Sequence, residues 1–557
     1  MRKLIKFLLV IVLLIVSVTA QAAGASADLT QLDLEQLLEL EVVTVYGASK
    51  FEQKVTEAPA SISIVSDDEI KKYGYRTIAD ILKSVKGFYI TTDRNYTFIG
   101  VRGFGRPSDY NTRILLLVDG HRLNDNIFDG AFVGTESVLD VDLIDRVEVI
   151  RGPSSSLYGT NAFFAVVNVI TKRGKDLKGM EISGEAGSLK TYKGRLNYGN
   201  KFQNGMELLI SGSAYDSQGK GRLFYKEFND PATNNGIAEN TDGDKYESFF
   251  TKLSFHDFTL HSGYSYREKR IPTASYGTVF NSSGTYTVDE WRYIDLKYEH
   301  DFSKKIDVMA RLYYDRYYYF GDYLINRPPV TQNKDSATGE WWGGELKFAA
   351  KPVKTHKLIL GFEYRDNLTQ DQGNYDESPY SSILNYSTES NNRGVYLQDE
   401  ISIIKDLILN LGLRYDYSNV FGENTSPRLA LIYSPLKKTT FKLLYGAAFR
   451  YPNAYELYYD DGGTTQKANT NLKAEEIQTY EAVYEQYLGE HFRSSVSYFQ
   501  YNINDLISQE TDPADGLLVF RNVEEIKAKG TELEMEGVWA NGLQVQASYT
   551  YQETENN

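Results

Sequence analysis

The sequence of 557 residues contains no cysteine, and only 4 of its residues are tryptophan. Without a thiol the chain can form neither a disulfide nor a thiolate metal site, and it has no cysteine nucleophile. The chain also has no excess of positive charge, because its net charge is −15. Nucleic-acid-binding proteins need clustered Lys and Arg to displace the counterions of phosphates, so this balance argues against a nucleic-acid partner.

Apolar runs long enough to form a membrane helix are also missing. The longest run, Phe7–Val18, follows the cations Arg2, Lys3 and Lys6 and precedes the small residues around Ala22. It is too short to span a bilayer, which takes about 20 residues. The order of charged, apolar and small segments predicts a secretory signal peptide at residues 1–22. A mature chain of this kind can enter a membrane only as a β-barrel.

Tyrosine and glycine are abundant, with 44 residues of each. From residue 178 onward, segments of alternating apolar and polar residues stand between loops rich in Asp, Asn and Gly; residues 358–364, 409–418 and 441–450 are examples. This alternation predicts strands with one apolar and one polar face. Such strands build either a soluble sandwich, with the apolar faces inside, or a membrane barrel, with the apolar faces outside. The signal peptide and the many tyrosines, which suit a membrane–water interface, favour the barrel.

Residues 58–173 combine helix start and stop signals with short apolar runs, a pattern that predicts a compact α/β domain. Ser66 and Glu69 form a capping box for a helix that ends at Gly74. A second helix is expected from Thr77 to Gly87. Strands are expected at the following apolar runs: 62–65, 99–102, 114–118, 147–150 and 165–171. Between the last two strands, Gly152-Pro153 predicts a compact turn.

Several motifs in and beyond this domain carry a family resemblance. The clearest are R-G-P-S-S-S-L-Y-G at Arg151–Gly159 and V-V-N-V-I-T-K at Val166–Lys172. Shorter ones are I-G-V-R-G-F-G at Ile99–Gly105, Y-G-A-A-F-R-Y-P at Tyr445–Pro452 and G-T-E-L-E at Gly530–Glu534. Together they resemble the plug and barrel motifs of TonB-dependent outer-membrane receptors. The resemblance runs from about residue 41 to the end of the sequence.

The resemblance implies an all-β transmembrane antiparallel barrel of about 22 strands, with an N-terminal α/β plug domain inside its lumen. Its expected divisions are a signal peptide at 1–22, a periplasmic leader at 23–57, the plug at 58–173 and the barrel at 178–557. Family barrels end on an aromatic strand, whereas this sequence ends in the loop-like Gln552–Asn557. We therefore expect the last barrel strands to be missing from it.

The resemblance also implies candidate site residues. The TonB box, which pairs as a strand with the energy-coupling protein TonB, is expected at Glu41, Val42, Val43, Thr44, Val45, Tyr46 and Gly47. Plug arginines of the family pair with barrel glutamates, and the matching positions are Arg102, Arg151, Glu481 and Glu532. The outward plug loops are where a substrate docks, and the candidates there are Phe104, Arg106 and Tyr110.

The implied function is active import across the Gram-negative outer membrane by a monomer, powered through the TonB–ExbB–ExbD complex. A ferric siderophore is the expected substrate, with cobalamin, haem and an oligosaccharide as alternatives. The resemblance disfavours haem, because haem receptors of the family carry a histidine between the F-R-x-P and N-L motifs and Tyr458–Ala468 contains none. A truncated, non-transporting relic and a passive porin or adhesin are further alternatives. No catalytic motif stands out, so we expect no enzyme activity, no cofactor and no resident metal.

Overall fold

A computed structural model describes residues 44–489, 491–539 and 543–556. Contacts divide the chain into Met1–Thr44 and Val45–Asn557, and the fold below is that of the second unit. The expected signal peptide and the first TonB box residues, Glu41, Val42 and Val43, lie outside the described residues.

The plug is built on a five-stranded sheet with the order β3-β8-β9-β6-β7. Its strands are β3 (Ser61–Ser66), β6 (Ile114–Val118), β7 (His121–Arg122), β8 (Ile144–Arg151) and β9 (Ala165–Thr171). β6 and β9 pair in parallel, and the other pairs are antiparallel. Every residue of β6 is buried, which explains why this strand reads as a continuous apolar run without alternation.

Short helices and a hairpin complete the plug. α3 (Asp67–Tyr73) has the predicted capping box and ends at Gly74 with φ of 67°. α4 (Ile78–Lys83) is shorter than predicted, because the Ser84 hydroxyl donates to the carbonyl of Ile81 at 2.7 Å and ends the helix well before Gly87. The predicted compact turn after β8 contains a helix, α5 (Ser155–Tyr158). The remaining elements are β1 (Thr44–Val45), β2 (Gln53–Lys54), η2 (Val55–Glu57), β4 (Phe88–Thr92), β5 (Thr97–Val101), η3 (Val141–Leu143) and α6 (Gly174–Leu177).

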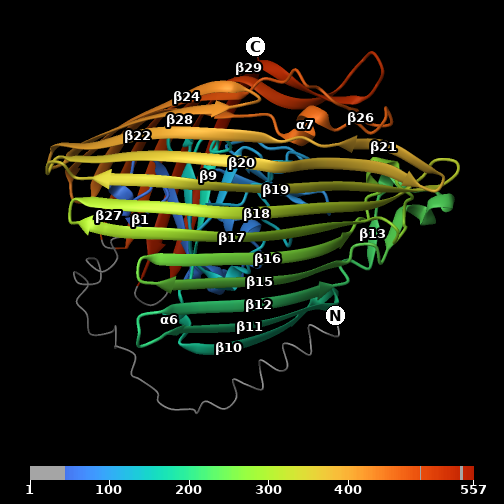
Figure 1. The fold of residues 1–557 in the computed structure, drawn as a ribbon, viewed down its shortest axis with the longest axis horizontal. Coiled ribbons are helices and arrows are strands. Elements are labelled where there is room, and N and C mark those ends of the chain that lie inside the picture. Colours follow the sequence, from blue (N-terminus) through green and yellow to red (C-terminus); the bar gives the residue numbers. More distant parts are fainter. Residues whose placement is uncertain (1–43, 490, 540–542, 557) are drawn as a thin grey trace. The chain divides into compact units, whose positions relative to one another are not determined.

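A 19-stranded sheet forms the rest of the unit, and Figure 1 shows its long strands running side by side. Strands adjacent in the sequence pair in antiparallel fashion throughout, apart from the short β21 and β26 insertions. Among the described strands, β10 and β30 are the two edges of this sheet. The strands are β10 (Gly179–Gly187), β11 (Thr191–Lys201), β12 (Glu207–Ser217), β15 (Asp244–Phe255), β16 (Phe258–Arg270), β17 (Tyr286–Ser303), β18 (Ile306–Ile325), β19 (Thr331–Ala350), β20 (His356–Glu377), β21 (Tyr380–Tyr386), β22 (Ser390–Ile404), β23 (Leu407–Ser418), β24 (Gly422–Leu436), β25 (Thr439–Arg450), β26 (Gln466–Lys467), β27 (Glu475–Leu488), β28 (Phe492–Thr511), β29 (Leu518–Val538) and β30 (Gln544–Asn556).

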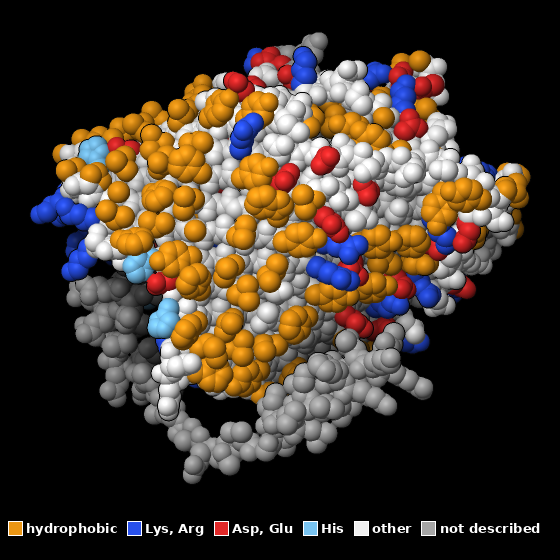
Figure 2. Space-filling model, in the orientation of Figure 1, with side chains coloured by type: hydrophobic (Ala, Val, Ile, Leu, Met, Phe, Trp, Pro, Cys, Tyr) orange, Lys and Arg blue, Asp and Glu red, His pale blue; other side chains and the backbone are white. Residues whose placement is uncertain are grey.

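The two faces of this sheet decide between a soluble sandwich and a membrane barrel. On β23 the apolar Leu411, Leu413 and Tyr415 are exposed, whereas the polar Asn410 and Arg414 are buried. Figure 2 shows the resulting cover of apolar side chains over the outer face of the strands. A water-soluble fold would place these faces the other way round, so the arrangement is that of a transmembrane barrel with a polar inner face. None of the helices in the described ranges has the length and apolar character needed to cross a membrane.

The connections between the strands differ between the two ends of the sheet. One end has short turns at 202–206, 256–257, 304–305, 405–406 and 437–438. The other has long segments at 218–243, 271–285 and 451–474, which contain β13 (Arg222–Phe224), η5 (Lys226–Phe228), η6 (Pro231–Gly236), β14 (Ile237–Glu239), η7 (Ser275–Gly277) and α7 (Ala454–Tyr458). Outer-membrane barrels have short periplasmic turns and long extracellular loops. The long-loop end is therefore the extracellular end.

The lipid-facing position Leu413 provides a test of this orientation. We expect Leu413→Arg, in the middle of β23, to lower the free energy of unfolding in lipid vesicles by about 2–4 kcal/mol. Val330→Arg is the matched control, because Val330 is as exposed (54%, against 52% for Leu413) but lies in the loop before β19. Denaturant unfolding in vesicles measures both variants. Equal losses would contradict the assignment of the Leu413 face to lipid.

Candidate functional site

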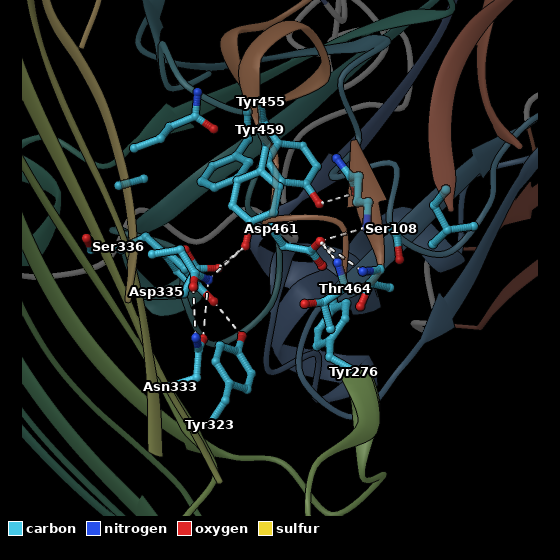
Figure 3. A pocket seen from close by; sticks show the side chains of 18 of the residues that line it. Ser108, Tyr276, Tyr323, Asn333, Asp335, Ser336, Tyr455, Tyr459, Asp461 and Thr464 are labelled. Atoms are coloured by element: carbon cyan, nitrogen blue, oxygen red, sulfur yellow. Dashed lines mark hydrogen bonds between the residues drawn. The ribbon is translucent and has the colours of Figure 1, made fainter. Parts of the chain in front are cut away.

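A cavity of about 200 Å³ lies at the long-loop end, between the plug and the barrel wall (Figure 3). Aromatic rings dominate its lining. They are Tyr96, Tyr110, Phe128 and Phe132 from the plug and Tyr276, Tyr317, Tyr319, Tyr323, Tyr455, Tyr459 and Phe520 from the barrel strands and loops. Rings packed in this way present flat apolar faces with hydroxyl groups at their edges, which suits a ligand that carries rings of its own.

Polar groups occupy one side of this cavity. The Tyr459 hydroxyl donates to Asp335 Oδ2 at 3.0 Å, and Asn374 Nδ2 donates to the Tyr459 oxygen at 3.2 Å (Figure 3). Asp461 Oδ1 accepts the backbone N–H groups of Thr464 and Thr465 at 2.9 and 2.8 Å, which fixes the turn that leads into β26. The cavity therefore combines an aromatic surface with acceptor groups held in fixed positions.

The plug forms the floor of the cavity through the loop that carries Phe128 and Phe132. Asp125 holds this loop: its Oδ1 accepts the N–H groups of Ile127 and Phe128 at 2.7 and 2.6 Å, and its Oδ2 accepts that of Gly130 at 2.8 Å. Burial raises the pKa of the Asp125 carboxyl to about 7, although these hydrogen bonds act in the opposite direction. The Asp125 carboxyl group thus accepts three backbone N–H groups of the loop, and Asn111 and Asn453 donate to its carbonyls at Ala131 and Phe128.

The three expected substrate residues lie in different places. Tyr110 lines the cavity. Arg106 lies outside the lining, with its guanidinium carbon 5.9 Å from the centroid of the Phe520 ring. Phe104 stacks on Phe164 with ring centroids 5.1 Å apart and packs against the core. The lining residues Asp335 and Tyr459 were not expected, because they come from strand ends and loops that no sequence motif marks.

Arg102 lies between the plug and the barrel wall with its side chain fully buried. Its Nε and Nη2 donate to Glu532 at 3.1 and 3.0 Å, and its Nη1 and Nη2 donate to Glu481 at 3.2 and 2.9 Å. Nη1 also donates to the Tyr501 hydroxyl at 2.9 Å. Burial alone would lower the pKa of Arg102, but the two carboxylates raise it well above its usual value. The three expected residues Arg102, Glu481 and Glu532 therefore form one buried ionic contact.

A close approach of the backbone makes room for this contact. Gly87 has φ of +75°, and a Cβ atom at this position would lie 2.4 Å from Glu532 Oε1. Any other residue would push the glutamate away from the plug. The Arg102 N–H donates to the Gly87 carbonyl at 2.7 Å, so the same glycine also positions the arginine backbone.

The fourth expected residue, Arg151, makes its hydrogen bonds within the plug, while its charge also acts on Glu532 of the wall. Its Nη1 and Nη2 donate to the hydroxyl groups of Ser63 and Ser61 on β3, both at 2.8 Å. A cation that the motifs did not single out, Lys86, contacts Glu534 of β29 at 2.8 Å in a fully buried pair. The only sequence feature that could have pointed to Lys86 is its position just before Gly87, the glycine expected to end the second helix.

The described part of the expected TonB box, Thr44 to Gly47, includes residues packed into the plug. The N–H groups of Tyr46 and Gly47 donate to Glu148 Oε2 at 3.2 and 2.9 Å. The Gly47 carbonyl accepts the Tyr158 hydroxyl at 2.8 Å. In this conformation the backbone at positions 46 and 47 is engaged by the plug.

Lys50 connects the chain just after this segment to the wall. Its buried ammonium group donates to Glu345 and Glu363, both at 2.6 Å. Glu363 in turn accepts Arg414 Nη2 at 2.6 Å, and Arg414 Nη1 donates to the Leu157 carbonyl of the plug at 3.0 Å. A chain of charged contacts thus runs from the N-terminal segment to the helix α5.

Three wall cations also hold the plug through its backbone. Lys347 donates to the Lys50 carbonyl at 2.8 Å, and Lys442 donates to the carbonyls of Val55 and Ala60 at 2.9 and 3.2 Å. Arg428 donates to the Ala48 carbonyl at 3.0 Å and to that of Pro59. We call Lys347, Arg428 and Lys442 the backbone clamp.

A barrel with an apolar outer face, a plug held by buried ionic contacts and an aromatic cavity under the outer loops define a plugged outer-membrane receptor. The family "TonB dependent receptor-like, beta-barrel" matches residues 234–557, and the "TonB-dependent Receptor Plug Domain" matches residues 54–166. The chain belongs to the TonB-dependent receptors of the outer membrane. The resemblance in the motifs and the fold class it implied are thereby confirmed.

Two characterised relatives show similarity over most of the chain. An iron-regulated outer membrane virulence protein of Vibrio cholerae serotype O1 is 24% identical, over 96% of this chain and 80% of the relative. The vitamin B12 transporter BtuB of Vibrio vulnificus is also 24% identical, over 88% of this chain and 75% of the relative.

Solved structures share the fold at lower identity. The ferripyoverdine receptor of the Pseudomonas aeruginosa outer membrane, bound to ferripyoverdine, has a TM-score of 0.68 at 17% identity, covering 92% of this chain and 73% of its own. A mutant of the ferric enterobactin receptor PfeA from the same species, in complex with enterobactin, has a TM-score of 0.68 at 19% identity, covering 89% of this chain and 81% of its own.

The Arg102 contact predicts a large difference between the two plug arginines. We expect Arg102→Met to lower the free energy of unfolding of the detergent-folded protein by about 3–5 kcal/mol, because it leaves two buried carboxylates without a cation. Arg151→Met is the comparison variant: it leaves two neutral serine hydroxyl groups without their partner, which costs less than leaving two buried carboxylates without a cation, so we expect a smaller loss. Denaturant unfolding, followed by hydrogen exchange of plug amides, measures both. Equal losses of unfolding free energy in the two variants would show that the Arg102 contact with Glu481 and Glu532 stabilises the protein no more than the Arg151 contacts do.

Lys50 predicts how firmly the N-terminal segment is held. We expect Lys50→Met to raise the exchange rate of the amides at residues 46–60 by about tenfold or more, because the ion pairs with Glu345 and Glu363 are lost. Lys54→Met is the control, since Lys54 is half-exposed and pairs with Glu57 at 3.6 Å within the same segment. Unchanged exchange in Lys50→Met would mean that the backbone clamp and the contacts with Glu148 and Tyr158 hold the segment without the Lys50 ion pairs.

Proposed function

We propose that this receptor binds a ferric siderophore in the aromatic cavity and imports it into the periplasm with energy supplied through TonB. The observation that carries the proposal is the position of the cavity. It lies under the extracellular loops, and the plug closes it from below through Phe128 and Phe132. A ligand bound there cannot pass without movement of the plug. Passive diffusion is therefore a poor fit to this geometry, and an energised step is needed.

The contacts of the plug support a stepwise release. The N-terminal segment is held by Lys50 and by the backbone clamp, which lie near the periplasmic turns. The segment proposed to bind TonB, residues 41–47, immediately precedes Lys50. Force applied there would reach the Lys50 ion pairs before it reaches the buried Arg102 contact. We propose that the Lys50 ion pairs break and that the Arg102 contact holds the rest of the plug in the barrel.

Uptake of radiolabelled ferric chelates by a receptor-deficient host tests the proposal. We expect the wild-type gene product to restore uptake. Val43→Pro should abolish it while surface binding is kept, because proline removes an N–H donor that strand pairing with TonB needs. Val330→Pro, in an outer loop next to Pro329, is the control for the effect of proline itself. Uptake that continues in Val43→Pro would refute coupling through residues 41–47.

Cobalamin import is the second candidate, and the similarity to BtuB supports it. Labelled cyanocobalamin supplied to the same strains distinguishes the two substrates. Restored uptake of cobalamin without uptake of any ferric chelate would replace the siderophore in the proposal and leave the transport mechanism intact.

A further inference from the structure

The charges around the cavity set a condition on its ligand. Its lining contains two acids, Asp335 and Asp461, and one cation, Arg327. Arg327 is already engaged, because its Nη2 donates to Asp376. The cavity therefore presents more negative than positive charge to anything that enters it.

The cations in neighbouring positions are engaged in the same way. Lys334, next to Asp335 on β19, contacts Asp322 at 2.6 Å. Lys467, next to the lining residue Gln466, contacts both Asp512 and Asp515 at 2.7 Å. An anionic ligand would have to break one of these pairs to gain a counterion, and the released acid would then repel it.

Arg106 is the one cation that the motifs suggested for an anionic chelate. Its guanidinium group lies over the Phe520 ring. Phe520 lines the cavity and Arg106 does not, so the cavity wall has an aromatic ring at this point and not the expected cation. The aromatic rings themselves carry negative charge on their faces, which attracts cations and disfavours anions.

We infer that the cavity accepts a neutral or cationic, ring-bearing chelate and rejects a polyanionic one, with Asp335 as the specificity-determining residue. The inference rests on the proposed function, since it names the class of chelate that the receptor imports. Asp335 is suited to this role because the Tyr459 hydroxyl fixes its carboxylate on the wall of the cavity. Burial raises the pKa of Asp335 to about 7, so its carboxyl group is fully ionised only above that pH. Once ionised, in surroundings of low polarity, it repels a like charge more strongly than it would in water.

Direct binding to the full-length receptor in outer-membrane vesicles tests the inference, at a pH about two units above the pKa of about 7 that burial gives Asp335. The probes are three ⁵⁵Fe-labelled chelates: a neutral ferric tris-hydroxamate, a ferric hydroxamate with a free ammonium group, and a ferric tris-catecholate, which is an anion. We expect the first two to bind at least about 100-fold more tightly than the third, which corresponds to repulsion by one or two poorly screened charges.

Variants show whether Asp335 is responsible. Asp335→Asn keeps an acceptor for the Tyr459 hydroxyl and removes the charge. We expect it to weaken binding of the cationic chelate about tenfold, to leave the neutral one within about twofold, and to strengthen binding of the tris-catecholate. Glu389→Gln is the matched control, because it removes an exposed carboxylate outside the cavity and should change none of the three.

The outcomes separate this inference from the proposed function. Tightest binding of the tris-catecholate, lost in Arg106→Gln, would overturn the inference and leave siderophore import standing. Equal effects of Asp335→Asn on all three chelates would also overturn it, since a change of fold and not of charge would then be the cause. If no chelate of any charge binds, the proposed function fails and the inference fails with it.

Discussion

A strand in lipid can satisfy its backbone only by pairing with its neighbours, and the rest of this structure follows from that constraint. Paired strands have one face in lipid, which must be mainly apolar, and the buried charged side chains of the sheet, such as Arg414 and Glu532, lie on the inner face. The plug meets a wall of carboxylates and cations as a result. It can be stable there only if its own buried charges are matched, as Arg102 is by Glu481 and Glu532.

The contacts between plug and wall differ in kind. Lys50 and Lys442 each bring one ammonium group to acids or carbonyls of the other domain. Arg102 makes a forked contact with Glu481 and Glu532 through several N–H groups. At the extracellular end the plug contributes rings, such as Phe128, to the cavity. Contacts of one ammonium group at the N-terminal segment and a forked contact farther along the chain fit a plug that is partly displaced and not expelled.

The sequence predicted those features that depend on neighbours along the chain. The capping box of α3, strand β9 and the two faces of β23 follow from local spacing. The resemblance brought Arg102, Glu481 and Glu532 to notice, although hundreds of residues separate them. Helix α5 was missed because it is four residues long and has no side-chain cap, so nothing in the local sequence marks it. The early end of α4 was missed because the hydrogen bond from the Ser84 hydroxyl to the Ile81 carbonyl is not evident from composition. Asp335 and Tyr459 could not be found, since one lies near the start of β19 and the other in the loop after α7, and only the folded barrel brings them together.

The backbone clamp has a consequence for how the two domains can change over time. Lys347, Arg428 and Lys442 grip carbonyl oxygens, and every residue carries such an oxygen whatever its side chain. Substitutions at positions 48, 50, 55, 59 and 60 therefore leave this part of the grip intact, whereas the loss of one wall cation removes it. The clamp therefore sets no requirement on residue type at the start of the plug, where Lys50 is required by its own ion pairs and Ala48 and Ala60 by their burial, whereas each of the three wall cations must be kept.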